Sequence, residues 1–87
     1  VPILCLDVRP TISRFQAWPE IQAMNRALNA VCDTDRNAHF VATSPEHLDD
    51  NGRPKEALLR DDKLHLSRAG YELWTKQIKS ALDDVLK

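Results

Sequence analysis

Strong net charge, closely spaced cysteines and long apolar runs are all missing from this sequence. The 87 residues carry a formal net charge of −1, with no basic excess to attract nucleic acid and no polybasic patch for anionic lipid. The longest apolar run, VPILCLDV, is far too short to cross a bilayer. These absences argue against a nucleic-acid-binding protein and against a membrane-spanning one.

The two cysteines, Cys5 and Cys32, lie in apolar runs without CxxC spacing. We expect buried free thiols rather than a disulfide, and free thiols fit a reducing compartment, which slightly favours the cytoplasm. No signal-peptide pattern is present, but the chain opens without Met on a hydrophobic run, as a fragment does. The compartment therefore stays open.

The composition, with 43% hydrophobic and 29% charged residues, is that of an ordinary soluble globular protein. Two short runs, residues 2–8 and 38–43, are almost continuously apolar and predict strands buried on both faces. Between them, after Ser13, a helix is expected, with an apolar stripe on one face made of Ile21, Met24, Leu28 and Val31. A strand–helix–strand unit with short connections predicts that the two strands are parallel.

A second helix is the clearest element of the sequence. Ser67 is a good N-cap, and apolar residues then recur at helical spacing as Tyr71, Trp74, Ile78, Leu82 and Val85. The long polar connection before it, with its Asn51-Gly52 turn, is of the length at which function is suspected.

The predicted fold is α/β, in the order β-α-β-loop-α with two parallel strands. Two such strands need cover on both faces and neighbours at their edges, which two helices cannot supply in full. We therefore expect a partial three-layer α/β/α sandwich whose sheet is completed by a missing segment or by self-association.

The segment DDKLHLSRAGYELW, residues 61–74, carries the candidate chemistry. An imidazole near its ordinary pKa takes and returns a proton at neutral pH, and a carboxylate on its other nitrogen fixes the tautomer. Asp62 and His65 have the spacing for such a pair, beyond the carboxyl end of the second strand, where open α/β sheets bind ligands. The alternative is structural, with Asp62 capping a turn and His65 packing at the surface.

The same segment resembles the last sequence block of the SGNH hydrolases, also called the GDSL esterase/lipase family. The resemblance rests on Asp62-x-x-His65-Leu66-Ser67 followed by Gly70, Tyr71 and Trp74 in register. The earlier stretches VPILCLDVRPTISRF and HFVATSPEHLDDNGRPKEALLRDD are similar to that family's penultimate and last strands with the loops that follow. The resemblance spans essentially the whole chain.

The resemblance implies that residues 1–87 form a single partial domain, the last two strands and helices of a flavodoxin-like sandwich. It implies that Asp62 orients His65, and that His65 is the general base for a serine that attacks an acyl or acetyl ester. No cofactor is implied.

The family's other blocks are missing from these 87 residues. There is no Gly-Asp-Ser block for the nucleophile and no Gly-x-Asn-Asp block for the oxyanion hole. Ser13 and Ser44 follow the two strands and could line the same crevice, Ser67 is expected as the helix N-cap, and Ser80 lies on the final helix. The pair is therefore expected to be half of a triad, and the chain alone to be nearly inactive.

Three further groups of residues leave alternatives open. The histidines His39, His47 and His65 fit no closed zinc spacing, so no metal site is predicted. The arginines after the first strand, Arg9 and Arg14, either contact an anionic group near the crevice or are solvated or ion-paired. For Trp18 and Trp74, packing is favoured over ligand stacking.

Two functions follow. The first is the C-terminal segment of an SGNH-type ester hydrolase, with an ester as substrate once the missing portion is supplied. The alternative is a non-catalytic α/β module that retains the Asp–His block as structure and forms a homodimer through the first strand.

Overall fold

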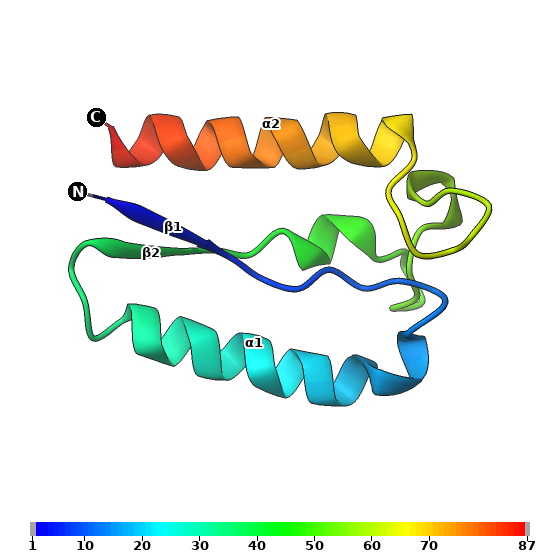
Figure 1. Cartoon of the computed structure of the whole chain (residues 1–87), viewed down its shortest axis with the longest axis horizontal. Coiled ribbons are helices and arrows are strands. Elements are labelled where there is room, and N and C mark those ends of the chain that lie inside the picture. Colours follow the sequence, from blue (N-terminus) through cyan, green and yellow to red (C-terminus); the bar gives the residue numbers. More distant parts are fainter. Residues whose placement is uncertain (1, 87) are drawn as a thin grey trace.

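The computed structural model describes residues 2–86, which form two parallel strands between two helices. Figure 1 shows helix α1 (Trp18–Cys32) on one face of the strands and helix α2 (Arg68–Val85) on the other, so the chain has three layers. This confirms the predicted α/β class and the expectation of an unclosed sheet. Within the described residues, no helix is long and apolar enough to span a membrane.

The sheet consists of β1 (Ile3–Leu6) and β2 (Ala38–Val41), paired in parallel with Ile3 opposite Ala38 and Leu6 opposite Val41. Both strands are shorter than predicted. The ladder continues by one bond, from the Asp7 amide to the Val41 carbonyl, and then ends. Beyond that point, side-chain hydrogen bonds take over the backbone groups of both chain segments.

Helix α1 follows a 3-10 turn, η1 (Phe15–Ala17), and has Pro19 in its first turn, where a missing N–H costs little. Its buried residues are Trp18 and Cys32. The predicted stripe is wrong in part, because the side chains of Met24 and Val31 are 61% and 64% exposed. A two-stranded sheet is too narrow to cover the whole apolar side of the helix.

Helix α2 confirms its predicted start. The Ser67 side chain accepts a hydrogen bond from the Gly70 amide, as an N-cap does. Of its predicted apolar stripe, Trp74, Ile78 and Val85 are half-buried, whereas Tyr71 and Leu82 are exposed. The exposure of apolar residues on both helices has the same cause: a sheet of two strands is too narrow to cover the apolar sides of both helices.

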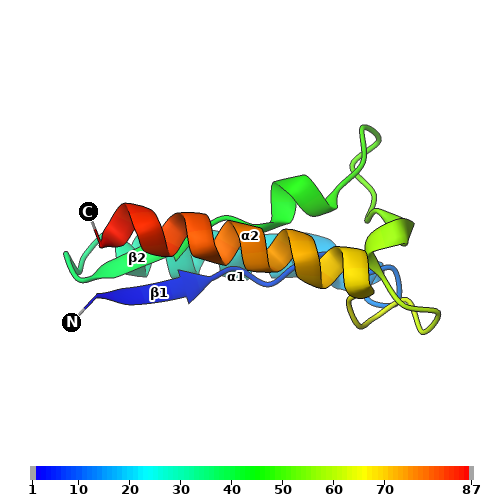
Figure 2. The same ribbon diagram turned by 90° about the horizontal axis from the view of Figure 1, so that it is seen from above.

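The open side of the sheet is the free edge of β1, which faces the reader in Figure 1 and lies at the lower side of Figure 2. Ile3 and Asp7 donate to the β2 side, so the amides of Leu4, Leu6 and Val8 point to the free edge. Asn25 on α1 occupies the last position, accepting from the Val8 amide at 2.9 Å and donating to its carbonyl at 3.0 Å. The unpaired edge is therefore short.

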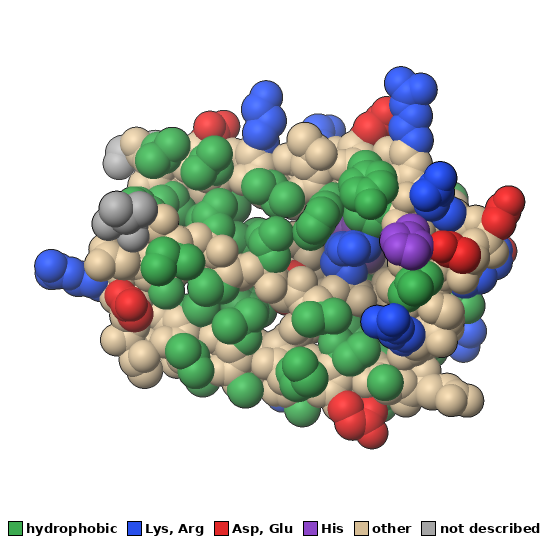
Figure 3. All heavy atoms as spheres, viewed as in Figure 1, with side chains coloured by type: hydrophobic (Ala, Val, Ile, Leu, Met, Phe, Trp, Pro, Cys, Tyr) green, Lys and Arg blue, Asp and Glu red, His purple; other side chains and the backbone are tan. Residues whose placement is uncertain are grey.

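Apolar side chains surround this edge. Figure 3 shows them spread over both helices and the strand between them on the face that carries β1. The exposed large apolar residues of the described chain are Ile3, Val8, Met24, Val31, Tyr71, Leu82 and Leu86. Exposed apolar surface gathered on one face is found at protein-interaction sites and at ligand-binding grooves.

The remaining residues form a structured connection between β2 and α2. It contains two 3-10 turns, η2 (Ser44–His47) and η3 (Glu56–Leu58), and two isolated antiparallel bridges, Leu48–Pro54 and Leu59–Leu66. Leu59 and Leu66, which form the second bridge, are buried apolar residues of this connection, and Leu66 is 2% exposed. This connection carries the Asp62–His65 segment and holds it against the start of α2.

Candidate active site

Asp62 and His65 form the predicted pair. The Asp62 Oδ2 atom lies 2.6 Å from His65 Nδ1, and Asp62 Oδ1 accepts from the backbone amides of Leu64 and His65 at 3.0 Å each. The hydrogen bond from His65, followed by the two amides, holds the pKa of Asp62 well below its ordinary range. The carboxylate is therefore ionised at neutral pH.

The hydrogen bond also fixes the state of the imidazole. An ionised carboxylate only accepts, so Nδ1 must carry the proton that lies between the two groups. In neutral His65 the free nitrogen is then Nε2, the atom able to take a proton from a nucleophile. The His65 side chain is 62% exposed, so this nitrogen is not shut away in the protein core.

The turn that joins the two residues is held in an unusual backbone conformation. Lys63 has φ 60°, in the left-handed region of backbone conformation that residues other than glycine rarely adopt. The Lys63 amide donates to the Arg60 carbonyl, and the Arg60 amide donates to the His65 carbonyl. The Lys63 side chain forms an ion pair with Glu56, with Nζ 2.6 Å from Oε1. Strained backbone held by surrounding bonds is typical of functional sites.

The start of α2 fixes the other side of the pair. The hydroxyl of Ser67 donates to the Ala57 carbonyl at 2.8 Å, and the Ser67 amide donates to the Leu58 carbonyl. At Gly70 a Cβ atom would clash with the Leu58 carbonyl oxygen, so only glycine fits there. Ser67 and Gly70 thus hold the Asp62–His65 turn against the start of α2.

A cavity of about 390 Å³ opens beside His65, beyond the carboxyl end of β1. His65 and Leu64 line one side, and Tyr71 and Trp74 of α2 line another. The residues that follow β1 complete it, with Ile21 of α1. This is the position in which open α/β sheets bind ligands. Its remaining lining residues are Asp7, Val8, Arg9, Thr11, Arg14 and Leu66.

Sequence reasoning missed Asp7, which ties the carboxyl ends of the two strands together. It is 7% exposed, and its carboxylate accepts from the Thr43 amide at 3.0 Å, the Thr43 hydroxyl at 2.5 Å and the Ser44 amide at 3.0 Å. A single acid at the end of an apolar strand was the signal that could have found it. Asp7 also lines the cavity beside His65.

His47, in the connection between β2 and α2, is buried and pairs with Gln77 of α2. It is 3% exposed, and its Nε2 atom lies 3.1 Å from Gln77 Oε1, while Gln77 Nε2 donates to the Thr43 carbonyl at 3.0 Å. Burial lowers the pKa of His47, and the Gln77 hydrogen bond opposes this only in part. The neutral imidazole is the form that the fold prefers.

The other predicted candidates lie elsewhere. Ser44 is buried and donates to the Val8 carbonyl at 3.1 Å, while Ser13 is exposed. Ser67 is the helix cap and Ser80 is exposed on α2. All four serines fall within residues 2–86, and the cavity beside His65 is lined by none of them. This part of the chain thus holds the Asp62–His65 pair without a serine in the lining of the cavity beside it.

Metal ligands do not converge within residues 2–86, where no three His, Cys, Asp or Glu side chains come together. His39 lies in β2, His47 in η2 and His65 in the turn. The two cysteines are free thiols, as predicted, with Cys32 buried and Cys5 half-buried. Trp18 and Trp74 lie in different helical layers, and Trp74 packs beneath the Arg9 guanidinium at 4.7 Å.

Comparison with known proteins found one kind of match, to a solved structure. No family model matches the chain, and no curated protein sequence does. A solved structure that matches is that of a Streptococcus pneumonia protein provisionally named a platelet activating factor. It shares 27% identity at a TM-score of 0.81. The match covers 94% of this chain and 42% of that one. This chain is thus similar to less than half of a longer protein.

Proposed function

We propose that residues 1–87 are the C-terminal segment of an SGNH-type serine ester hydrolase. His65 acts as the general base and Asp62 as the residue that orients it. The observation that carries the proposal is the bond between Asp62 Oδ2 and His65 Nδ1, which leaves Nε2 as the basic atom. The similarity to part of a longer protein supports a nucleophile supplied from outside these 87 residues.

In this mechanism His65 Nε2 removes the proton of a serine hydroxyl while the oxygen attacks the ester carbonyl. The imidazolium that forms is stabilised by the ionised Asp62 and later gives its proton to the leaving alcohol. Water then attacks the acyl-enzyme, again with His65 as base. The substrate is an acyl or acetyl ester, and the chain alone lacks the serine that starts the reaction.

A chimera tests this proposal directly. The present chain replaces the matched portion of the Streptococcus pneumonia protein, and hydrolysis of p-nitrophenyl acetate is measured beside the unaltered parent. We expect turnover by the chimera, and a fall of about 10³-fold or more in kcat for His65→Ala. His39→Gln, which removes a histidine from β2, is the matched control and should leave turnover unchanged.

A folded chimera whose turnover survives His65→Ala would rule out the catalytic role. The isolated chain provides a second arm, because we expect it to be nearly inert with or without His65. Turnover by the isolated chain that is lost both in His65→Ala and in a variant of one of its four serines would show that this serine is the nucleophile.

The free edge of β1 favours a second candidate, a non-catalytic module that dimerises through this strand. The supporting observation is the short unpaired edge at Leu4 and Leu6 with apolar side chains around it. Sedimentation at micromolar concentration should then show a dimer, and Ile3→Lys should return it to a monomer. Thr75→Lys, at an exposed position on α2, is the control. A monomeric wild-type chain would count against this function.

A further inference from the structure

Three buried polar atoms in the described residues have no hydrogen-bond partner, and all belong to residues that line the cavity beside His65. They are Arg9 Nη1, Thr11 Oγ1 and Trp74 Nε1. Buried polar atoms are nearly always paired, so each calls for an explanation. Two of the three are N–H donors and the third is a hydroxyl, so the group able to satisfy all of them is an acceptor.

The charges of the cavity point the same way. Arg9 and Arg14 both line it, and neither forms an ion pair among the described residues. Asp7, the carboxylate that shares the lining, already accepts from Thr43 and Ser44 on both of its oxygens. Two guanidinium groups therefore line the cavity against one carboxylate, that of Asp7, so the lining keeps a net positive charge.

Arg9 is held in place for such a ligand. Its guanidinium lies over the Trp74 ring at 4.7 Å to the centroid, a cation–π contact that limits the orientations of the side chain. Burial lowers the pKa of Arg9, and the nearby Tyr71 and Asp7 oppose this shift only in part. A guanidinium that stays charged under these conditions gains strongly from an oxyanion.

We propose that this cavity contains an anion subsite, and that the ester hydrolysed beside His65 carries a carboxylate or phosphate group bound by Arg9 and Arg14. This inference rests on the function proposed above and gives its substrate class. Arg9 binds the oxyanion from the α2 side of the cavity, and the exposed Arg14 adds a second positive charge. Thr11 and Trp74 supply the nearby polar groups that lack a partner in this chain.

Binding can be measured without any turnover. The ¹⁵N-labelled chain is titrated with sodium phosphate, and separately with sodium acetate, at constant ionic strength. The two tryptophan indole signals are followed and are assigned with a Trp18→Phe variant. We expect a saturable shift of the Trp74 indole signal, with the Trp18 signal, from the α1 layer, unmoved. The anion that binds at the lower concentration tells whether the subsite prefers a phosphate or a carboxylate group.

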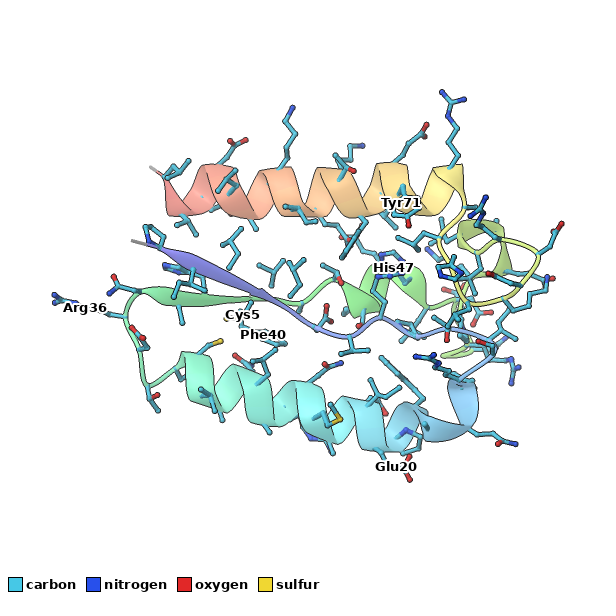
Figure 4. All side chains as sticks on the ribbon, in the orientation of Figure 1. Cys5, Glu20, Arg36, Phe40, His47 and Tyr71 are labelled. Atoms are coloured by element: carbon cyan, nitrogen blue, oxygen red, sulfur yellow. The ribbon has the colours of Figure 1, made fainter. Side chains whose placement is uncertain are left out.

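Arginine variants locate the site. We expect Arg9→Gln to abolish the shift and Arg14→Gln to weaken binding about tenfold, because one of two charged contacts is lost. Arg36→Gln is the matched control, since Figure 4 places Arg36 at the end of the molecule opposite to Tyr71. The same spectra report whether each variant is folded, and Arg14→Gln, at an exposed position, decides the matter if Arg9→Gln unfolds.

The proposal is overturned if neither anion moves the Trp74 signal, or if the arginine variants of the cavity respond as Arg36→Gln does. His65→Ala separates this result from the proposed function. Phosphate or acetate binding that persists in His65→Ala, together with an inert chimera, would keep the subsite and reject the hydrolase. Chimera turnover that depends on His65, without any anion binding by the chain, would keep the hydrolase and reject the subsite.

Discussion

Asp7 at the end of β1 accepts two hydrogen bonds from Thr43, one from its amide and one from its hydroxyl. The two residues are 36 positions apart in the chain and follow the two strands of the sheet. A third bond, from the Ser44 amide, occupies the other carboxylate oxygen. This contact closes the carboxyl end of the sheet, on which the cavity beside His65 is built.

Asp7→Ala should therefore be strongly destabilising. It leaves three donors without their acceptor in a buried place, and we expect a loss of about 3–5 kcal/mol in the free energy of unfolding. Thr43→Val removes only the hydroxyl bond and should cost about 1–2 kcal/mol. Urea unfolding measures both. Equal effects of the two variants would show that the two backbone amides contribute little.

Gly70→Ala tests the close approach between α2 and the preceding turn. In an exposed helix this change would stabilise by about 1 kcal/mol. Here the new Cβ atom meets the Leu58 carbonyl oxygen, so we expect a loss of about 1–3 kcal/mol instead. Ala69→Gly, one position earlier and exposed, measures helix propensity alone. The sign of the Gly70→Ala effect in urea unfolding decides between the two.

The Asp62–His65 bond should appear in the pH dependence of stability. The pKa of Asp62 is lower in the folded than in the unfolded chain, so its ionised form stabilises the fold above the ordinary carboxyl pKa of about 3.9. This stabilisation is lost as the pH falls through the folded pKa. Asp62→Asn should lower the urea midpoint at neutral pH, and its difference from wild type should shrink in acid.

Asp61→Asn is the matched control for that series, since it changes the neighbouring exposed acid. We expect it to move the urea midpoint little at any pH. A difference between Asp62→Asn and wild type that stays constant down to the most acid point would mean that the carboxylate charge contributes nothing to the fold.

His47 should affect the pH profile of stability closer to neutral pH than Asp62 does. Its pKa is lowered in the fold, so the unfolded chain binds a proton more readily and stability falls as the pH drops below about 6.5. The free energy of unfolding, measured between about pH 7 and pH 5, should therefore decrease in wild type and decrease less in His47→Gln. If His39→Gln flattens the profile equally, His47 is not the group responsible.

Local segments of the site could be predicted from the sequence because their partners lie close in the chain. The Ser67 cap reaches Gly70, and Asp62 reaches His65, each over three positions. The helices followed from apolar periodicity and the strands from short continuous apolar runs, which are local patterns too. The predicted stripe of α1 failed at Met24 and Val31 because burial depends on how far the sheet extends beneath the helix.

The helices, the Asp–His turn and the shortage of strands could all be read from local sequence patterns. Three contacts between distant residues could not: Asn25 on the Val8 backbone, Asp7 on Thr43 and Ser44, and Arg9 over Trp74. The difference lies in the distance along the chain. A hydrogen bond within one turn is set by local backbone geometry, whereas contacts across layers depend on how the strand, the helices and the connection pack together.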